Sequence, residues 1–121
     1  NYAKKEKLKI KTFVEDLEKY KIKEDYDAIV GLFSIHFLPK RKVYRLIKNM
    51  KNKTREKGYN FIGIFRKGKG NKNKYCFGNG ELSQMYHDWD IVSYKEFSKE
   101  ERHGNGPLHT HDISSLISQK K

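Results

Sequence analysis

Long apolar runs, cysteine and proline are the scarcest features of this 121-residue sequence. No apolar stretch approaches the roughly 20 residues that a membrane-spanning helix needs. Cys76 is the only cysteine, so an internal disulfide framework is excluded, as in proteins of a reducing cytosol. The first ten residues are rich in lysine and lack the apolar segment of a secretion signal. We therefore expect a cytoplasmic protein that makes no use of a membrane.

Basic charge is the most abundant feature that is present. Lysine and arginine number 27 against 15 acidic residues, which gives a formal net charge of +12. A basic balance favours polyanionic partners such as nucleic acid. The cations are scattered along the whole chain, however, which is more typical of a solvated surface. We expect one packed domain over residues 1–121, with nucleic-acid contacts that are non-specific.

The stretch Tyr26–Leu38 organises the rest of the sequence. Its nearly continuous apolar run, Ala28–Val30, is typical of a strand that is buried on both faces of a parallel sheet. Ligands of such sheets bind beyond the carboxyl ends of the strands. We therefore expect the chemistry at Gly31–His36. The alternative is a core strand with no site at its end, because short apolar runs are ambiguous.

The other elements follow from the spacing of apolar residues. Gly58 is expected to cap or turn the chain after the predicted helix Lys40–Lys53, and Arg66–Gly80 to form a mobile glycine-rich connection. Early strands alternate with helices, which favours a parallel sheet, whereas the last two strands have no helix between them and favour an antiparallel end. The predicted strands are Ile10–Val14, Tyr59–Phe65, Asp90–Phe97 and Leu108–Ser118, and the predicted helices are Lys40–Lys53 and Glu81–Trp89.

Three local patterns resemble a known family. They are Val14-Glu15-Asp16-Leu17 followed by Tyr26-Asp27-Ala28-Ile29-Val30, then Gly58-Tyr59-Asn60-Phe61-Ile62, and Phe77-Gly78-Asn79-Gly80-Glu81-Leu82 running on through Tyr86 and Trp89 to Tyr94. Together they resemble the C-terminal half of a class I S-adenosylmethionine (SAM)-dependent methyltransferase, most closely the tellurite-resistance (TehB-like) family. The third pattern is the most specific one.

The resemblance implies an α/β fold, namely the C-terminal part of a Rossmann-like, seven-stranded, mostly parallel sheet with an antiparallel end. The family's strand order is 3-2-1-4-5-7-6. Its first strands and its glycine-rich SAM loop have no counterpart here, so one side of Tyr26–Leu38 is expected to be open. The chain begins at Asn1 rather than at methionine. We expect a missing N-terminal half, or a dimer partner, to fill the gap.

The resemblance also implies a function. The complete protein would transfer a methyl group from SAM to a small, soft, anionic acceptor, such as a chalcogen oxyanion or a thiol. This chain alone is expected to be inactive. The alternative is a non-enzymatic, basic, nucleic-acid-binding module that derives from a truncated methyltransferase.

Two groups of residues match the family's cofactor site. Asp16 and Leu17 resemble the pair that reads adenine, although an acid here is also typical of a loop residue that caps the next turn. Leu32, Phe33 and Ser34 match the wall beneath the sulfonium, where exclusion of water favours methyl transfer. The alternative for these three residues is plain core.

The acceptor site is matched less closely. Arg102 and His103 are the candidate catalytic residues, which would hold an oxyanion, but alignment without gaps places the family's histidine-arginine pair on the acids Glu100 and Glu101. The alternative for this region is an exposed turn. No CxxC or HExxH motif suggests a metal. The candidate acceptor-lining residues are His36, Tyr75, Phe77, His109 and His111.

Overall fold

The computed structural model describes residues 15–17, 19–66, 77–102, 104–106 and 108–121. Among them, none of the helices combines the length and apolar character that crossing a membrane requires. The predicted strand 10–14 lies outside the described residues. The elements are β1 (Tyr26–Leu32), the 3-10 helix η1 (Ile35–Phe37), α2 (Lys40–Asn52), β2 (Thr54–Phe65), α3 (Glu81–Met85), β3 (Asp90–Arg102) and β4 (Leu108–Gln119).

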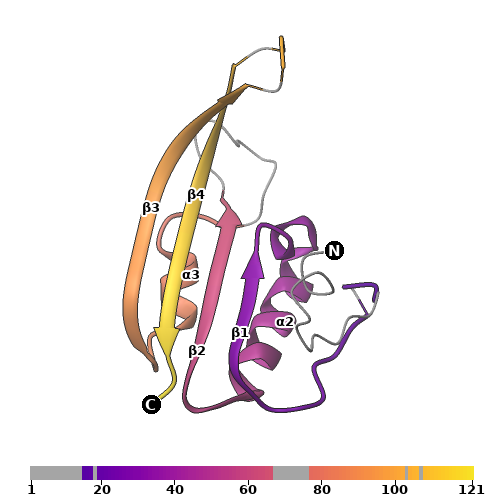
Figure 1. Cartoon of the computed structure of the whole chain (residues 1–121), viewed down its shortest axis with the longest axis vertical. Coiled ribbons are helices and arrows are strands. Elements are labelled where there is room, and N and C mark those ends of the chain that lie inside the picture. Colours follow the sequence, from indigo (N-terminus) through magenta and orange to yellow (C-terminus); the bar gives the residue numbers. More distant parts are fainter. Residues whose placement is uncertain (1–14, 18, 67–76, 103, 107) are drawn as a thin grey trace, which may run out of the picture.

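The four described strands form one mixed sheet in the order β1-β2-β4-β3 (Figure 1). β1 and β2 are parallel, whereas β4 is antiparallel to both of its neighbours, β2 and β3. The order corresponds to strands 4-5-7-6 of the expected sheet, and the antiparallel end is confirmed. Within these four strands the sheet is mixed rather than mostly parallel.

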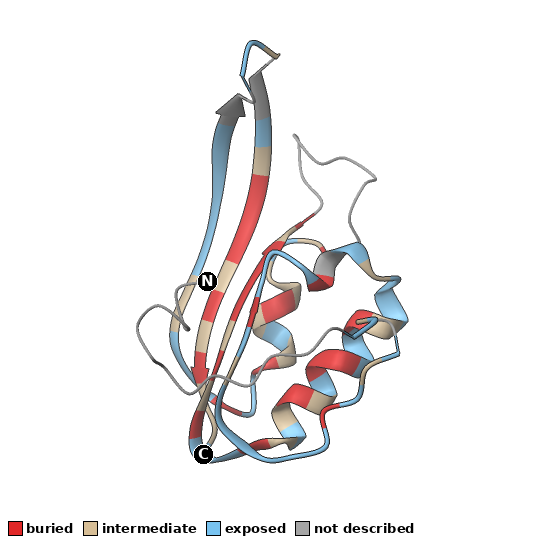
Figure 2. Ribbon diagram, turned by 45° about the vertical axis from the view of Figure 1, so that its right-hand side comes forward, coloured by how far each residue is buried: buried red, intermediate tan, exposed pale blue. Residues whose placement is uncertain are grey.

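Both helices lie on one face of the sheet (Figure 2). The predicted apolar stripe of α2, namely Val43, Leu46, Ile47 and Met50, is buried. It joins residues of β2 and β4 in one hydrophobic core, in which Ile47 is fully buried. A side chain of that size stabilises the fold by about 1.5–3 kcal/mol when buried. The sheet and α2 therefore hold each other in place.

The segment after α3 completes this core. Regular α-helix ends at Met85, short of the predicted Trp89, but the turns that follow bury both Tyr86 and Trp89. Their rings pack edge to face at 5.1 Å between centroids. Nζ of Lys51 lies 5.0 Å from the Tyr86 ring centroid and also binds the Asp88 carboxylate at 2.7 Å. The segment is thus fixed to α2 by a cation as well as by apolar contacts.

Strand β1 corrects the expectation that Tyr26–Leu38 forms a strand buried on both faces. The strand ends at Leu32, and Val30 and Leu32 are 59% and 56% exposed. β1 is an edge strand of the described sheet, and no described helix covers the face opposite α2 (Figure 2). No other described strand pairs with the outer side of β1, as expected, and Val30 and Leu32 are exposed because nothing described covers their face of the sheet.

The structure also corrects the expectation for Gly58, which lies inside β2 instead of forming a helix cap or turn. A Cβ added to it would lie 2.5 Å from the Asp27 carbonyl oxygen, so only glycine fits between the strands there. The left-handed residue is the preceding Lys57, with φ of 67°. The Lys57 N–H donates to Lys120 O at 3.0 Å, and the Lys120 N–H donates to Gly58 O at 2.9 Å. These bonds fix an irregular start of β2 to the end of the chain.

Candidate functional site

The candidate site is the edge of the sheet at which β1 and β2 both end. The two strands are parallel, so their carboxyl ends share this edge (Figure 1). The first half of β4 reaches the same edge, because β4 is antiparallel to β2. Ligands of open α/β sheets bind at this end of the strands. The edge therefore agrees with the location that the sequence predicts for the chemistry.

Phe33 turns the chain away from β1 at this edge. Its φ of 54° places a bulky residue in the left-handed region, a conformation that is often found at functional sites. The Phe33 N–H donates to the Gly63 carbonyl oxygen at 2.7 Å and so fixes the turn on β2. A Cβ added to Gly63 would lie 3.3 Å from both the Leu32 and the Phe33 side chains. Glycine at 63 thus allows these two side chains to lie close over β2.

Aromatic rings continue from Phe33 across the edge. The Phe33 and Phe65 rings are tilted with centroids 5.5 Å apart, and the Phe65 ring stacks on the His111 imidazole at 4.5 Å and 11°. The row joins residues from the end of β1, the end of β2 and the first half of β4. It offers polarisable rings of low polarity, the kind of wall that excludes water from a reacting sulfonium.

A buried cation follows the last residue of β2. Arg66 is 8% exposed, its N–H donates to the Asp112 carbonyl oxygen at 2.9 Å, and its Nη1 donates to Asn79 Oδ1 at 2.8 Å. Its Nε lies 4.0 Å from Oε2 of Glu96 on β3. These contacts hold residues 79–80 against the sheet. Sequence reasoning missed this cluster, although a charged residue directly after an apolar strand was a signal for it.

Glu96 is the acceptor at the centre of this cluster. Its Oε2 receives the Gly80 N–H at 2.5 Å and the Tyr94 hydroxyl at 2.5 Å. Partial burial alone would raise the pKa of Glu96, but the hydrogen bonds from Tyr94 and Gly80, together with the Arg66 charge, outweigh it and lower that pKa. The carboxylate therefore stays ionised at neutral pH and fixes the donors around it.

The predicted cofactor residues occupy two places. Leu32, Phe33 and Ser34 are exposed at the end of β1 and so are not part of the described core. Asp16 is exposed, and its carbonyl oxygen accepts the N–H groups of Lys19 and Tyr20, both at 2.9 Å, in a turn. Leu17 is partly buried against the core. The roles of these five residues toward a cofactor stay predictions.

The predicted acceptor residues are spread more widely. Phe77 is 2% exposed and packs edge to face against Tyr44 at 5.5 Å, which gives it a packing role in the core. Of the other candidates, His111 lies at the site edge, stacked on Phe65. Tyr75 and His103 lie outside the described residues, as does most of the predicted mobile connection. The backbone places His36 in η1, His109 in β4 and Arg102 at the end of β3.

The hairpin of β3 and β4 separates Arg102 from the end of β1. In register, Leu32 is opposite Gly63, Gly63 opposite Ser115, and Ser115 opposite Lys95. Arg102 lies seven residues beyond Lys95 on β3, or about 24 Å along the strand. The hairpin extends past the ends of β1 and β2 (Figure 1). The structure therefore does not bring Arg102 together with Leu32–Ser34.

Comparison with known proteins identifies one family and one fold. The family model of the tellurite resistance protein TehB matches residues 1–112. A relative from Haemophilus influenzae, described as the probable S-adenosyl-L-methionine-dependent methyltransferase TehB, is 33% identical over 97% of this chain. That match covers 43% of the relative, so the chain spans less than half the length of the curated relatives it matches.

Solved structures agree with the sequence match. The crystal structure of TehB from Haemophilus influenzae superimposes with a TM-score of 0.84 at 30% identity, over 99% of this chain and 44% of that chain. The N-methyltransferase NodS from Bradyrhizobium japonicum, in complex with S-adenosyl-L-homocysteine, gives a TM-score of 0.62 at 13% identity, over 88% of this chain and 52% of that chain. The second likeness shows the fold alone.

Proposed function

This chain belongs to the TehB tellurite-resistance family, and from that membership we propose that it is the C-terminal part of a SAM-dependent methyltransferase domain. The observation that carries the proposal is the open edge of β1, where Val30 and Leu32 are more than half exposed. An uncovered apolar edge strand is an aggregation hazard unless another strand pairs with it. The part of the relatives that this chain does not span, or a dimer partner, would pair with β1 and cover Val30 and Leu32.

SAM fits the chemistry of the residues at the carboxyl ends of β1 and β2. Leu32, Phe33 and Ser34 would form the wall beneath the sulfonium, and Asp16 with the Leu17 backbone would contact the adenine. The exposed apolar side chains and the left-handed Phe33 support this assignment. When bound, SAM supplies the methyl group together with a neutral thioether as leaving group. The chain's own residues orient the cofactor and exclude water from it.

The acceptor is proposed to be small, soft and anionic, such as a chalcogen oxyanion or a thiol. The net charge of +12 attracts such anions. Alignment of acceptor and methyl group for in-line displacement lowers the barrier by roughly 7–11 kcal/mol. Arg102 and His103 are the proposed oxyanion-holding residues, with His36, Tyr75, His109 and His111 as further lining. This assignment requires the tip of the β3–β4 hairpin to approach the end of β1.

A chimaera tests the proposal. The segment of Haemophilus influenzae TehB that precedes its matched region would be joined to this chain, and SAM binding would be measured by calorimetry for the chimaera and for the chain alone. We expect micromolar binding, with release of S-adenosyl-L-homocysteine on addition of tellurite or a thiol, from the chimaera only. Circular dichroism would establish that both proteins are folded. Micromolar binding by the chain alone, or none by a folded chimaera, would overturn the proposal.

A further inference from the structure

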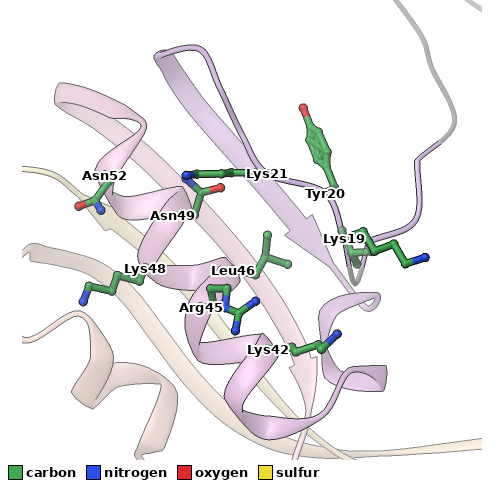
Figure 3. A pocket seen from close by; sticks show the side chains of 10 residues that line it. Lys19, Tyr20, Lys21, Lys42, Arg45, Leu46, Lys48, Asn49 and Asn52 are labelled. Atoms are coloured by element: carbon green, nitrogen blue, oxygen red, sulfur yellow. The ribbon is translucent and has the colours of Figure 1, made fainter.

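A second candidate site lies between the segment 15–22 and α2 (Figure 3). It is a groove of about 440 Å³, and no carboxylate of the described residues lines it. Leu17 is the only proposed cofactor residue among its lining. The cations of this basic groove are Lys19, Lys21, Lys42, Arg45 and Lys48.

Specific contacts fix the segment that forms one wall of the basic groove on α2. Asn49 of α2 accepts the Ile22 N–H on its Oδ1 at 2.7 Å and donates from its Nδ2 to the Ile22 carbonyl oxygen at 3.4 Å. The Ile22 side chain is buried in the core beside Leu46. The segment that carries Lys19 and Lys21 is therefore fixed on α2 through both its backbone and its core contacts.

Four of the five cations in the groove have no ion-pair partner among the described residues. α2 has six basic residues among 13 and no acid. Lys40 and Lys51 pair with Glu81 and Asp88 at 2.9 and 2.7 Å. Within the described residues, by contrast, no carboxylate pairs with the side chains of Lys19, Lys21, Arg45 and Lys48.

The positions of the basic residues along α2 destabilise the helix. Like charges three or four residues apart repel each other on a helix, as Arg45 does with Arg41 and Lys48. Basic residues in the first turn also oppose the positive end of the helix dipole, and Lys40, Arg41 and Lys42 occupy that turn. Arg45 and Lys48, unlike Lys40 and Lys51, therefore do not stabilise the fold through their charge. An anion bound in the groove would remove both penalties.

The positions of the cations in the groove indicate an extended anion. In Figure 3 the five cationic side chains point in different directions, with Lys48 on one side of α2 and Lys19 on the other, and they do not converge on one point. Lys42 and Lys48 are six residues apart, a rise of about 9 Å along the helix. A compact phosphate would contact only part of the row, whereas a polyanionic strand can contact all of it.

Tyr20 adds an aromatic ring to the groove lining. A positively charged groove combined with an aromatic side chain is the recognition mode of proteins that bind single strands, in which bases stack on the ring. We propose that the basic groove binds single-stranded nucleic acid through its phosphate backbone, without reading its sequence. Apart from Leu17, the lining takes no part in the methyl-transfer proposal, so the 121-residue chain by itself serves for the test.

Fluorescence anisotropy of the 121-residue chain with a labelled single-stranded RNA of about 12 nucleotides tests this proposal, since the length matches known site sizes. The groove variant is K21Q/R45Q/K48Q. The matched control is K57Q/K95Q/K121Q, which removes the same charge from residues outside the groove lining. We expect only the groove variant to lose affinity by about tenfold or more at 0.15 M salt. Its salt slope should flatten by about 2, or about 0.7 for each lost phosphate contact.

Two outcomes would overturn the proposal. Equal losses in the groove and control variants would show that net charge alone attracts the RNA. Unlabelled RNA displaces the labelled strand at a certain nucleotide concentration. Displacement by AMP or inorganic triphosphate at that same concentration would show that the groove binds a compact anion instead. Thermal unfolding of both variants provides the structural check, and we expect the groove variant to melt at the same or a higher temperature, because like-charge repulsion on α2 is relieved.

Discussion

The hydroxyl of Tyr86 donates a hydrogen bond to Oδ1 of Asn60 at 2.7 Å, inside the core. Nδ2 of Asn60 then donates to Thr54 Oγ1 at 2.7 Å, and that hydroxyl donates to the Met50 carbonyl oxygen at 2.7 Å. Burial, with a smaller contribution from Asp88, raises the pKa of Tyr86, so the phenol stays a neutral donor. The chain of bonds connects the segment after α3, strand β2 and the end of α2.

Replacing Tyr86 by Phe should lower the free energy of unfolding by about 1–3 kcal/mol, because Oδ1 of Asn60 loses its hydrogen-bond donor in a buried position. Urea titration followed by circular dichroism measures this. Tyr26→Phe is the control, since the Tyr26 hydroxyl makes an exposed bond to Glu24 at 3.4 Å. Equal stabilities of the two variants would show that the buried chain of bonds adds nothing.

Gly58→Ala should be strongly destabilising, by about 1–3 kcal/mol or more. The new methyl group would lie 2.5 Å from the Asp27 carbonyl oxygen and 2.9 Å from that of Arg55, and backbone atoms cannot move aside as a side chain can. Gly78→Ala is the matched control, because no atom lies within 4 Å of a Cβ added there. The melting temperature of each variant measures the effect. A Gly58→Ala protein as stable as the control would contradict the tight approach of β1 and β2.

Asp16→Ala should weaken SAM binding by about 1–3 kcal/mol in the chimaera, the usual effect of leaving a buried donor of the ligand unpaired. Glu15→Ala provides the control, because it removes a neighbouring, exposed carboxylate. Calorimetry at one salt concentration compares the two dissociation constants. If Asp16 is an ordinary loop residue, both variants will bind SAM as the parent does.

Stability should fall in acid, and Glu96 should account for part of the fall. Its pKa is lowered in the folded state, so the unfolded chain binds more protons in acid and stability rises with pH through that range. The contribution is present above the ordinary glutamate value of 4.5 and is lost as pH falls through the lower folded value. Glu96→Gln should therefore flatten the dependence of unfolding free energy on pH below about 4.5.

The control for this experiment is Glu56→Gln, which changes an exposed glutamate outside the cluster of Arg66, Tyr94 and Gly80. Chemical unfolding at a series of acidic pH values gives both profiles. A Glu96→Gln profile as steep as that of the control would mean that the carboxylate gains nothing from its donors on folding.

The sequence by itself determined the elements and their order. The spacing of Val43, Leu46, Ile47 and Met50 marked the buried face of α2, because a helix repeats its faces at a fixed interval. The absence of a helix before the last strand gave the antiparallel end. The family resemblance gave the sheet order and the open side of β1, and it directed attention to Leu32–Ser34, which do lie at the carboxyl edge.

Tertiary structure alone decided which distant residues meet. Asn60 and Tyr86, Arg66 and Glu96, and Asn49 and Ile22 are far apart in the chain, and local periodicity carries no information about such pairs. The same holds for Gly58, which the sequence offers as a turn residue but which the pairing of β1 with β2 requires inside a strand. The exposure of β1 was decided in the same way. An apolar run predicts a strand, but whether its faces are covered depends on the elements that pack against the sheet.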